Sequence, residues 1–510
     1  MSAQVHTIAL EGVVARPVEV EVDLHRGLPH VNVVGLPDGA VREAKDRVRA
    51  ALANSGFALP PRRVTINLAP ADLPKEGSGY DLPIAVALLV AMDVVSQDAV
   101  NRRLLLGELA LDGRLKPVPG CLPAAIRARD DPQMDELVVP ADNSAEAALV
   151  PGVTVVAPRT VTELVQHLTG ATPLPAVPTT AWQHWLGQDD DSVPDLAHVK
   201  GQEHAKRALE IIAAGGHNLL MSGPPGSGKT LLSRCLPKIL PELSLEEALE
   251  VTAIYSVAGK LSGERPVIGV RPFRAPHHTA SQVALIGGGS IPRPGEVSLS
   301  HRGILFLDEL PEFGRSVLEV LREPMESGGV TISRAARSAW FPAQFQLIAA
   351  CNPCPCGHLG DPYHACQCPA VQVDRYRSRL SGPLLDRIDL HVEVPPVPVE
   401  QLVAMPSGEA SAVVRQRVVQ ARARQQRRNG ANRLNAHLAG DELAEHTRVD
   451  QEGESLLLLA SRRMGFSART YHRILKVART LADLAGDKEI AVVHLAEAIQ
   501  YRVNRQFTVE

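Results

Sequence analysis

The sequence is poor in aromatic residues and contains no long apolar run. Phe, Trp and Tyr make up 3% of the 510 residues, and no stretch stays apolar for the length that a membrane-spanning helix needs. The N-terminus, MSAQVHTIALEGVV, lacks the basic start and continuous apolar core of a secretory signal. We therefore expect a soluble, cytoplasmic protein with no membrane partner. A chain of this length predicts several domains.

Neither sign of charge dominates, and cysteines are few. The formal net charge is −4, with 53 Lys and Arg against 57 Asp and Glu, so the overall balance neither favours nor excludes a polyanionic partner. Of the 7 cysteines, most fall between Cys351 and Cys368. Because cytosolic thiols stay reduced, this clustering indicates metal ligands before disulfides.

The alternation of short apolar runs and helical periodicity predicts an α/β multidomain protein. Residues 1–168 predict an α+β domain, and the proline-rich residues 169–194 with their acidic triplet are typical of an exposed linker. Residues 195–398 have an α/β pattern, and residues 399–510 are almost entirely helical in pattern. In the first domain, strands and helices are expected at Val18–Val22, Val31–Val34, Val64–Asn67, Leu137–Val139, Ala40–Ser55 and Leu82–Met92.

The stretch NLLMSGPPGSGKT places an apolar strand before a glycine-rich loop and a helix, and matches the pattern GxxxxGK[ST]. In such a loop backbone N–H groups wrap phosphates, the lysine reaches the β and γ oxygens, and the hydroxyl ligates Mg²⁺. The sequence therefore predicts an ATP and Mg²⁺ site formed by Gly223, Pro224, Pro225, Gly226, Ser227, Gly228, Lys229 and Thr230.

Two further apolar stretches end on polar side chains. GILFLDEL predicts a buried strand that delivers Asp308 toward Mg²⁺ and Glu309 toward a water that attacks the γ-phosphate. QFQLIAACNP predicts another strand, which ends on Asn352. An amide there could orient the same water, but a simple Asn-Pro turn would place the same residue there, so both interpretations stay open.

These motifs, with RPFRAPHHTAS, ALIGGGSIPRPGEVSLSHRG, ACNPCPCG and YRSRLSGPLLDRIDLHVEV, resemble the magnesium-chelatase-like AAA+ ATPases of the YifB/ComM type along essentially the whole chain. The resemblance implies a central AAA+ P-loop domain, a C-terminal helical lid and a homo-oligomeric ring, expected to be a hexamer. It also implies roles for three residues. Asn352 would be sensor 1, Arg387 an arginine finger that reaches a neighbour's γ-phosphate, and Arg469 sensor 2 on the lid.

The N-terminal region resembles the proteolytic domain of Lon, which has a ribosomal S5 domain 2-like fold. The resemblance lies in PADLPKEGSGYDLPIAVALLVA and LLLGELALDGRLKPVPGCLPAAIRA. A Ser–Lys dyad needs an amine beside the hydroxyl, but Ser78 is displaced from the nucleophile's place and Pro123 stands where the lysine would fall. We expect a Lon-like domain without peptidase chemistry, reused for assembly or nucleic-acid contact, although Lys75 and Lys116 lie near these loops.

Arginines in two places are candidate DNA contacts. GGVTISRAARSAWFPAQFQLIA predicts a β-hairpin with Arg334 and Arg337 at its tip, suited to phosphates. Residues 415–433 contain seven arginines and no acidic residue. Such a one-signed helix repels itself unless something anionic faces it. An exposed hairpin and a solvated lid helix are the plain alternatives.

A third candidate DNA contact is the segment RPVIGVRPFRAPHHT, an expected loop insertion before GILFLDEL. Arg271 and Arg274 would line this loop. The adjacent His277 and His278 have no carboxylate or thiol nearby in sequence, so we interpret them as polar loop residues in preference to metal ligands.

The clustered cysteines have the spacing CxC–x9–CxC, with His358 and His364 between the pairs. Four thiolates would hold Zn²⁺ tetrahedrally, and metal binding would then stabilise a loop that has few apolar residues. Free thiols or a redox pair are the alternative. Cys351 is expected to be a core residue at a strand end, and the four candidate ligands are Cys354, Cys356, Cys366 and Cys368.

Three hypotheses for function follow. The first is a ring-forming AAA+ ATPase that moves on single-stranded or branched DNA without sequence specificity; the resemblance implies helicase or branch-migration work on recombination intermediates in natural transformation. The second is the ATPase motor subunit of a metal-chelatase-like or protein-remodelling complex. The third, an ATP-dependent protease, is weakened by Pro123 and by the displaced Ser78.

Overall fold

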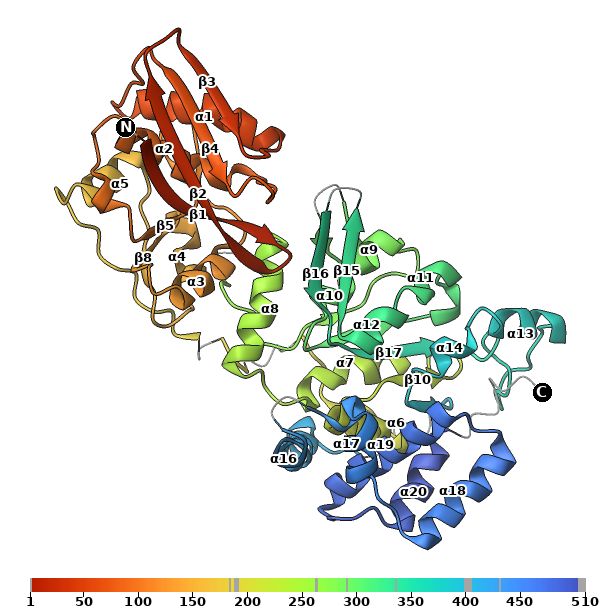
Figure 1. The fold of residues 1–510 in the computed structure, drawn as a ribbon. Coiled ribbons are helices and arrows are strands. Elements are labelled where there is room, and N and C mark those ends of the chain that lie inside the picture. The colour runs from red at the N-terminus through yellow and green to blue at the C-terminus, as the bar shows by residue number, and fades with distance from the viewer. Residues whose placement is uncertain are drawn as a thin grey trace.

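The computed structural model describes residues 2–182, 185–187, 192–261, 265–289, 292–334, 337–398, 406–430 and 433–502. Figure 1 shows three regions in chain order: an N-terminal α/β region, a central α/β region with a projecting hairpin, and a C-terminal helical region beneath the central one. None of the helices in the described residues combines the length and apolar character that crossing a membrane requires.

The N-terminal region is a mixed sheet of strand order β3-β4-β2-β1-β5-β8-β9. The β1–β2 and β2–β4 pairs are antiparallel, whereas β5, β8 and β9 continue the sheet in parallel. The strands are β1 (Ser2–Glu11), β2 (Val14–His25), β3 (His30–Val34), β4 (Arg63–Ala69), β5 (Arg103–Leu105), β8 (Glu136–Val138) and β9 (Thr154–Val156). The expected strands are confirmed.

The helices of this region are α1 (Gly39–Asn54), α2 (Asp81–Ala91), α3 (Cys121–Asp130), α4 (Ser144–Ala147) and α5 (Val161–Leu168), and a small hairpin joins β6 (Glu108–Leu109) to β7 (Leu115–Lys116). The side chain of Asp38 caps α1 by accepting from the N–H of Val41. α2 is apolar on nearly every side and is buried from Asp81 to Val90, because it packs on both the sheet and α1.

The central region is a parallel sheet of order β11-β14-β17-β10-β18. Its strands are β10 (Leu219–Ser222), β11 (Phe273–Arg274), β14 (Ile304–Leu307), β17 (Gln346–Cys351) and β18 (Leu390–Glu393). β10, β14 and β17 are buried at every residue, as expected for parallel strands covered on both faces.

Helices and two hairpins surround this sheet. The helices are α6 (Glu203–Gly215), α7 (Lys229–Ile239), α8 (Leu245–Val257), α9 (Gln282–Ile286), α10 (Glu296–Leu299), α11 (Arg315–Glu319), α12 (Arg322–Ser327), α13 (Ala370–Arg377) and α14 (Gly382–Leu385). We call β12 (Gly287–Gly288) with β13 (Arg293–Pro294) the short hairpin, and β15 (Gly329–Arg334) with β16 (Arg337–Pro342) the long hairpin. The long hairpin was expected from the sequence and is confirmed.

The C-terminal region consists of α16 (Ser411–Asn429), α17 (Gly440–His446), α18 (Gln451–Met464), α19 (Ala468–Ala485) and α20 (Val492–Gln500). α19 begins at the capping side chain of Ser467, which accepts from the N–H of Thr470, and ends at Gly486 in the left-handed conformation. Its apolar face enters the same core as α6 and the central strands.

Two apolar cores cross the boundaries expected from the sequence. One core joins the central sheet to α16, α19 and α20. Another joins α3 of the N-terminal region to α8 of the central region, where Leu249 and Ala253 are buried. Most described residues between 169 and 182 are exposed, but Val177 and Trp182 pack against this second core. The regions are therefore held together by continuous packing.

Candidate functional site

The polar residues expected to bind nucleotide come together at one edge of the central sheet. Lys229 and Thr230 follow β10, Asp308 follows β14, and Asn352 follows β17, and these three strands are parallel neighbours. The Thr230 hydroxyl donates to Asp308 Oδ2 at 2.8 Å. Lys229 Nζ lies 3.4 Å from Asn352 Oδ1. The carboxyl ends of parallel strands are where ligands bind in open α/β sheets.

The glycine-rich loop has the backbone that its composition requires. Gly226 and Gly228 have φ of 76° and 94°, a region in which L side chains are strained. α7 begins at Lys229, so the free N–H groups of its first turn face the loop. Lys229 Nζ donates to the carbonyl oxygens of Gly223 and Pro224 at 2.7 and 2.9 Å, and burial lowers the pKa of this amine.

Glu309 lies at the same edge in an uncommon conformation. Its φ is +51°, which a non-glycine residue adopts only when its surroundings hold it there. Its N–H donates to Asp308 Oδ1 at 2.9 Å. Its carboxylate is 52% exposed and pairs with the imidazole of His278, with 3.2 Å between Oε2 and Nδ1.

Sequence reasoning assigned His278 no role at this site. The reason for its position is topological: β11 pairs in parallel with β14, so the residues that follow both strands emerge at the same edge of the sheet. Phe273 and Arg274 form a strand of only two residues, too short for periodicity to reveal. Because Phe273 stands between Pro272 and Arg274, the sequence contains no apolar run there that could have revealed the strand.

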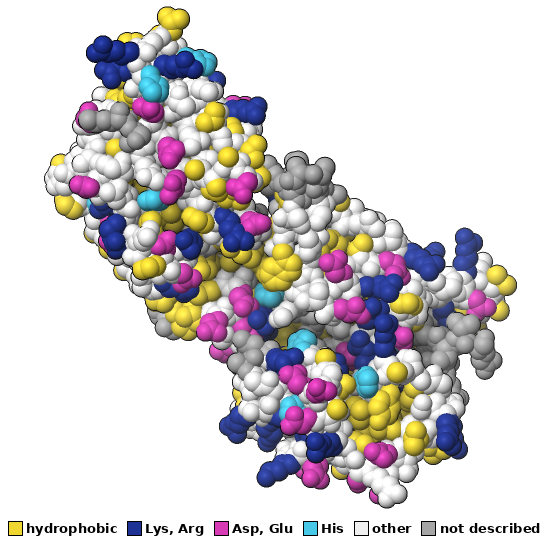
Figure 2. All heavy atoms as spheres, in the orientation of Figure 1, with side chains coloured by type: hydrophobic (Ala, Val, Ile, Leu, Met, Phe, Trp, Pro, Cys, Tyr) yellow, Lys and Arg dark blue, Asp and Glu magenta, His cyan; other side chains and the backbone are white. Residues whose placement is uncertain are grey.

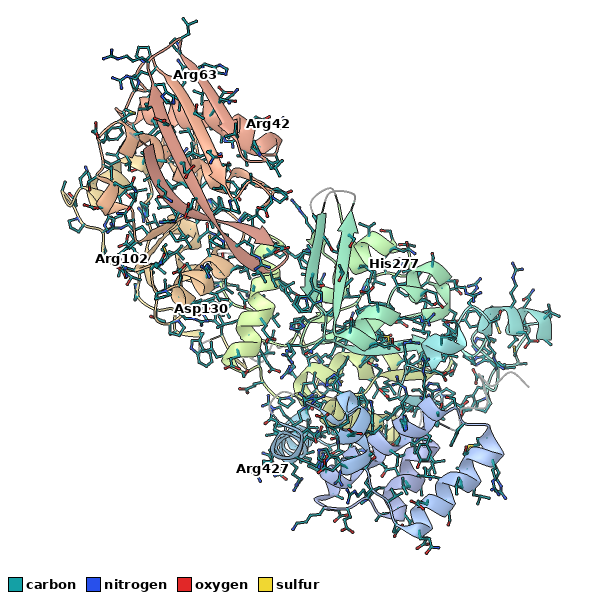
Figure 3. All side chains as sticks on the ribbon, in the orientation of Figure 1. Arg42, Arg63, Arg102, Asp130, His277 and Arg427 are labelled. Atoms are coloured by element: carbon teal, nitrogen blue, oxygen red, sulfur yellow. The ribbon has the colours of Figure 1, made fainter. Side chains whose placement is uncertain are left out.

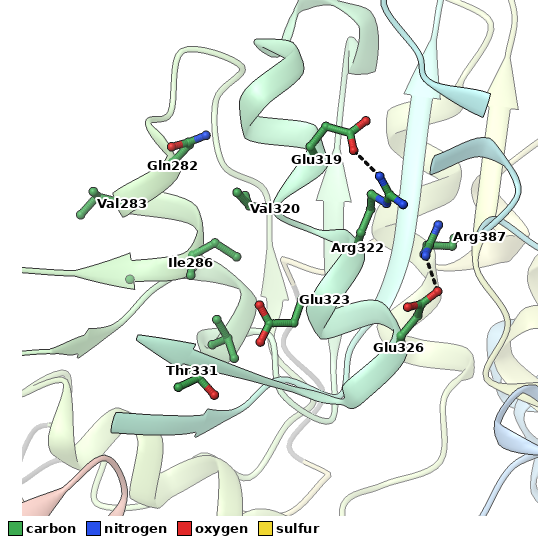
Figure 4. Close-up of a pocket in the computed structure, with 12 residues that line it drawn as sticks. Gln282, Val283, Ile286, Glu319, Val320, Arg322, Glu323, Glu326, Thr331 and Arg387 are labelled. Carbon is green, nitrogen blue, oxygen red and sulfur yellow. Dashed lines mark hydrogen bonds and ion pairs between the residues drawn. The ribbon is translucent and has the colours of Figure 1, made fainter. Parts of the chain in front are cut away.

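Arg387 lies at the opposite edge. Its carbonyl oxygen accepts from the side-chain amide of Asn218 at 3.2 Å, and Asn218 directly precedes β10, whereas the glycine-rich loop follows β10. The guanidinium donates to the carbonyl oxygen of Pro383 at 2.6 Å and pairs with Glu326. It lines an open pocket of about 520 Å³ (Figure 4). In Figure 2, Lys and Arg side chains gather on this face over α12 and α14.

Arg469 lies in the first turn of α19 and is exposed. It follows the capping residue Ser467, so its position on the helix is fixed although its side chain faces solvent. The next arginine along this helix, Arg473, turns inward and pairs with the buried Asp389.

Two candidate DNA residues are engaged within the protein. Arg271 is 8% exposed; it pairs with Glu247 at 2.9 Å and donates to the carbonyl oxygens of Pro241 and Arg302. Arg274 forms a two-point pair with Glu296, at 2.6 and 2.8 Å. These guanidinium groups form ion pairs within the central region. The expectation that both arginines line a loop available for DNA is therefore wrong.

The arginine-rich helix α16 also faces carboxylates of the same chain. Arg417 pairs with Glu210 and Glu409, and Arg428 pairs with Asp483 at 2.7 and 2.8 Å. Glu210 and Asp483 are far away in the sequence and Glu409 lies just before the helix, so the charge pattern of residues 415–433 alone did not reveal these partners. Arg427 is exposed (Figure 3). The self-repulsion that suggested an anionic partner is therefore largely relieved within the fold.

The long hairpin projects from the central region directly before β17 (Figure 1). The backbone of Arg334 pairs with that of Arg337 at its end. The tip itself, residues 335 and 336, and the side chains of these two arginines lie outside the described residues. Trp340 on β16 is 52% exposed, and the turn of the β1–β2 hairpin approaches it: a Cβ on Gly12 would lie 2.3 Å from the Trp340 carbonyl oxygen.

Four thiols gather between β17 and α13. The Sγ atoms of Cys354 and Cys356 are 3.4 Å apart, and both lie 3.7 Å from Sγ of Cys366. The backbone N–H of Cys356 donates to Sγ of Cys368. In a tetrahedral site with Zn–S bonds of about 2.3 Å, sulfur atoms are about 3.8 Å apart. The donor set therefore fits Zn²⁺.

The two histidines of this segment face a separate carboxylate. Nδ1 of His358 and Nδ1 of His364 lie 2.9 and 3.2 Å from the same oxygen of Asp361. The hydrogen bond from His358, then that from the backbone N–H of Tyr363, and then the contact with His364 lower the pKa of Asp361 to about 2. Cys351 ends β17 and is buried, which confirms its expected place in the core.

In the N-terminal region the hydroxyl of Ser78 donates to the carboxylate of Glu108. Lys116 lies on the other side of this carboxylate, with 3.9 Å between Nζ and Oε1. Pro123 lies inside α3. Lys75 is buried and donates to the carbonyl oxygen of Pro70, and burial lowers its pKa.

Three family models match successive parts of the chain. Residues 195–402 match the family described as magnesium chelatase, subunit ChlI. Residues 20–143 match subunit ChlI of Mg-chelatase, and residues 408–502 match the magnesium chelatase subunit ChlI C-terminal family.

Several relatives align with nearly the whole chain, and others align with part of it. Competence protein ComM of Haemophilus influenzae is 45% identical over 502 residues, which cover 98% of this chain and 97% of the relative. The uncharacterized protein YifB of Escherichia coli is 46% identical over 500 residues, covering 98% and 96%. The magnesium-chelatase 38 kDa subunit of Cereibacter sphaeroides is 27% identical over 171 residues, covering 30% and 51%.

Proposed function

The chain belongs to the YifB/ComM family of magnesium-chelatase-like proteins, and from this premise we propose that it is a ring-forming, Mg²⁺-dependent AAA+ ATPase that couples ATP hydrolysis to movement on DNA. The observation that carries the ATPase proposal is the meeting of Lys229, Thr230, Asp308 and Asn352 at one edge of three adjacent parallel strands. A lysine, a hydroxyl and a carboxylate at this edge form the donor set that a nucleoside triphosphate with Mg²⁺ requires.

Each residue of this edge has a role in the hydrolysis. The loop N–H groups and Lys229 bind the phosphate oxygens, and Thr230 with Asp308 holds Mg²⁺, which neutralises phosphate charge when bound. Glu309 accepts a proton from water as the water oxygen attacks the γ-phosphorus, and the bond to the ADP oxygen breaks. Asn352 orients that water. Lys229 must exchange its present backbone carbonyl partners for phosphate, which its flexible stem permits.

The position of Arg387 supports a ring. It lies at the amino end of β10, and the phosphate loop lies at the carboxyl end of the same strand. An arginine so placed acts on the nucleotide of a neighbouring subunit, and hydrolysis then depends on assembly. Arg469 on α19 is the proposed sensor 2, a further residue that responds to the nucleotide, and it belongs to a C-terminal lid of residues 399–510. We propose a hexamer.

The long hairpin is the proposed DNA contact. It projects beside the ATPase core and continues directly into β17, the strand that ends near Asn352. A shift of the hairpin therefore reaches the nucleotide site through one strand. Phosphate contacts from Arg334 and Arg337 at its end would bind single-stranded or branched DNA without reading sequence. In this proposal the protein remodels recombination intermediates during natural transformation.

The remaining regions have structural roles. We propose that Cys354, Cys356, Cys366 and Cys368 hold a structural Zn²⁺ that fixes the segment between β17 and α13. Residues 1–168 would form a Lon-like domain without peptidase activity, because the Ser78 hydroxyl donates to the Glu108 carboxylate and Pro123, within α3, stands where the lysine of Lon would fall. Residues 169–194 connect it to the ATPase core of residues 195–398.

The decisive experiment is the ATPase rate of the purified protein with and without single-stranded and branched DNA. Lys229→Ala and Glu309→Gln serve as inactive variants, and Glu312→Gln serves as the matched control, because the Glu312 side chain pairs with Arg379. We expect DNA to raise the rate of the wild type and of Glu312→Gln only. ATPase activity without DNA stimulation, and without DNA binding at low salt, would favour the alternative function.

That alternative is the motor subunit of a metal-chelatase-like or protein-remodelling complex. It is favoured by the match of the chain to magnesium chelatase subunit models. Such a motor would hydrolyse ATP at the same edge and would require partner subunits. Mass measurement of the wild type and Arg387→Ala with nucleotide tests the ring, which both functions share.

A further inference from the structure

A further cavity lies at the edge of the central sheet opposite the nucleotide site. Its volume is about 80 Å³, several times the roughly 10–15 Å³ that one water molecule needs. Gly303 and Gln346 line it at the amino ends of β14 and β17, and Gln426 of α16 lines it from the C-terminal region. Gln426 and His437 are exposed, so the cavity opens to solvent on their side. A small solute can therefore enter it.

Among the described residues, three arginines but only one carboxylate line this cavity. The arginines are Arg271, Arg302 and Arg422, and the carboxylate is that of Glu247. Arg271 uses its guanidinium on Glu247 and on backbone carbonyl oxygens. Arg302 pairs through Nε with Glu250, which is 44% exposed and does not line the cavity. Positive charge is therefore in excess at this place.

Arg422 lines the cavity from the side of the C-terminal region. Its Nε donates to the carbonyl oxygen of Ala213 at 2.9 Å, but within the described part of the chain its guanidinium has no ion pair and its terminal nitrogens have no hydrogen-bond partner. Arg417 and Arg428 of the same helix both pair with carboxylates. Burial, and then the charge of Arg271, lower the pKa of Arg422 to about 9. An anion in the cavity would offset both effects.

The backbone of Arg302 fixes its position at the opposite wall. Its φ is +57°, a conformation that costs a non-glycine residue free energy and that surrounding contacts must hold. The Arg302 N–H donates to the carbonyl oxygen of Gln344 at 2.7 Å, and the Arg302 carbonyl oxygen accepts from Arg271 Nη1 at 2.7 Å. Arg302 is therefore held in place by contacts of its main chain, which leaves its terminal nitrogens available to a ligand.

The chemistry of the wall selects the ligand. Guanidinium groups donate parallel N–H bonds to two oxygens of a phosphate, and their charge repels a metal ion. Burial, and then the charges of Lys476 and Arg302, lower the pKa of His437 to about 4, so at neutral pH its imidazole is an uncharged donor. The volume lies well below the roughly 300–1,000 Å³ of pockets for drug-sized ligands. A single small oxyanion therefore suits the cavity.

We propose that this cavity binds a phosphate group between Arg302 of the central region and Arg422 of the C-terminal region. The site is separate from the nucleotide edge, because it lies at the amino ends of strands whose carboxyl ends lead to Lys229 and Asp308. The ligand is inorganic phosphate or the terminal phosphate of a nucleotide, which present the same oxygens. Because its two arginines belong to different regions, the bound phosphate holds α16 against the central sheet.

The test measures the binding of inorganic phosphate by isothermal titration calorimetry at constant ionic strength, with chloride as the comparison anion. The parent is the full-length protein with Lys229→Ala, which weakens phosphate binding at the glycine-rich loop. The cavity variants of this parent are Arg422→Gln and Arg302→Gln. Arg424→Gln is the matched control, because Arg424 lies on the same helix, donates to the carbonyl oxygen of Asp483 and does not line the cavity.

We expect the parent and Arg424→Gln to bind one phosphate per chain. Arg422→Gln and Arg302→Gln should each weaken this binding by roughly tenfold or more, because each removes a charged donor. No phosphate binding in the parent, equal affinity in all four proteins, or equal binding of chloride would overturn the inference. Pyrophosphate distinguishes the two sources: tighter binding than that of phosphate assigns the site to a nucleotide, and equal or weaker binding assigns it to free phosphate.

Hydrogen–deuterium exchange in the parent tests the site without any change to the cavity, in case a cavity variant does not fold. Phosphate should slow exchange in α16 and in the residues directly before β14, and unchanged exchange in both segments would contradict the proposed position. Neither measurement requires ATP hydrolysis or DNA. The phosphate site can therefore be confirmed or overturned whatever the outcome for the proposed function.

Discussion

The buried histidine His217 makes the junction with the C-terminal helices sensitive to acid. It lies between α6 and β10, is fully buried, and its Nε2 lies 2.7 Å from the hydroxyl of Thr480 on α19. Burial lowers the pKa of His217 from 6.5 to about 4, although Asp389 opposes this. The unfolded chain therefore binds a proton between these pH values and the folded chain does not.

The sign and size of the effect follow from this difference. The contribution of a neutral buried histidine is complete above pH 6.5 and is lost as pH falls toward about 4. Between pH 7.5 and pH 5.5 the loss is about 1.4 kcal/mol, roughly a tenfold change in the opening equilibrium. Because Thr480 lies in α19, we expect the loss in the amides of this helix.

The assay is hydrogen–deuterium exchange at both pH values, corrected for the intrinsic pH dependence of exchange. Protection of α19 in the wild type should fall by roughly tenfold. His217→Gln keeps a polar group that can reach Thr480 and does not titrate, so its corrected protection should not depend on pH through this site. Equal pH dependence in the wild type and in His217→Gln would refute the reasoning.

Three further changes have predictable results. Cys366→Ser should lose the Zn²⁺ that we expect in the wild type, as measured by an assay that releases metal from thiols. Cys235→Ser, at a buried position in α7, should retain the Zn²⁺. A metal-free wild type with normal folding would contradict the zinc proposal. Glu326→Gln removes the charge that pairs with the buried Arg387, and it should lower the protein concentration at which ATPase activity is half-maximal; an unchanged concentration would argue against competition between Glu326 and a neighbouring subunit for this arginine. Asp483→Ala removes the carboxylate that pairs with the buried Arg479 and the half-buried Arg428, and it should cost about 3–5 kcal/mol in urea denaturation. A loss below about 1 kcal/mol would show that the network is dispensable.

Local patterns predicted the elements of this protein well where one chemical requirement fixes several neighbouring residues. The glycine-rich loop needs positive φ at Gly226 and Gly228 and a helix directly after it, and all of these are encoded within one short stretch. The apolar run that ends at Asp308 must be a buried strand, because a polar group interrupts it only at its end. The arrangement of such strands into neighbours follows from the general rules of parallel sheets.

Contacts between distant segments could not be predicted in the same way. The seven arginines of residues 415–433 appeared unpaired because their partners, such as Glu210 and Asp483, lie far away in the sequence. Arg271 appeared to lie in a free loop, but it is buried against Glu247. His278 reaches Glu309 only because a strand of two residues extends the sheet. A run of like charges in the sequence indicates that partners of opposite charge are required, but it does not identify those partners.

The core shared by α3 and α8 determines how this protein can be divided. Leu249 and Ala253 belong to the central region by sequence but are covered by side chains of the N-terminal region. A chain cut at residue 195 would leave this apolar helix face in water, where it favours aggregation. Removing the N-terminal region therefore tests the solubility of α8 as much as the function of what was removed, and point substitutions on the intact chain give the cleaner comparison.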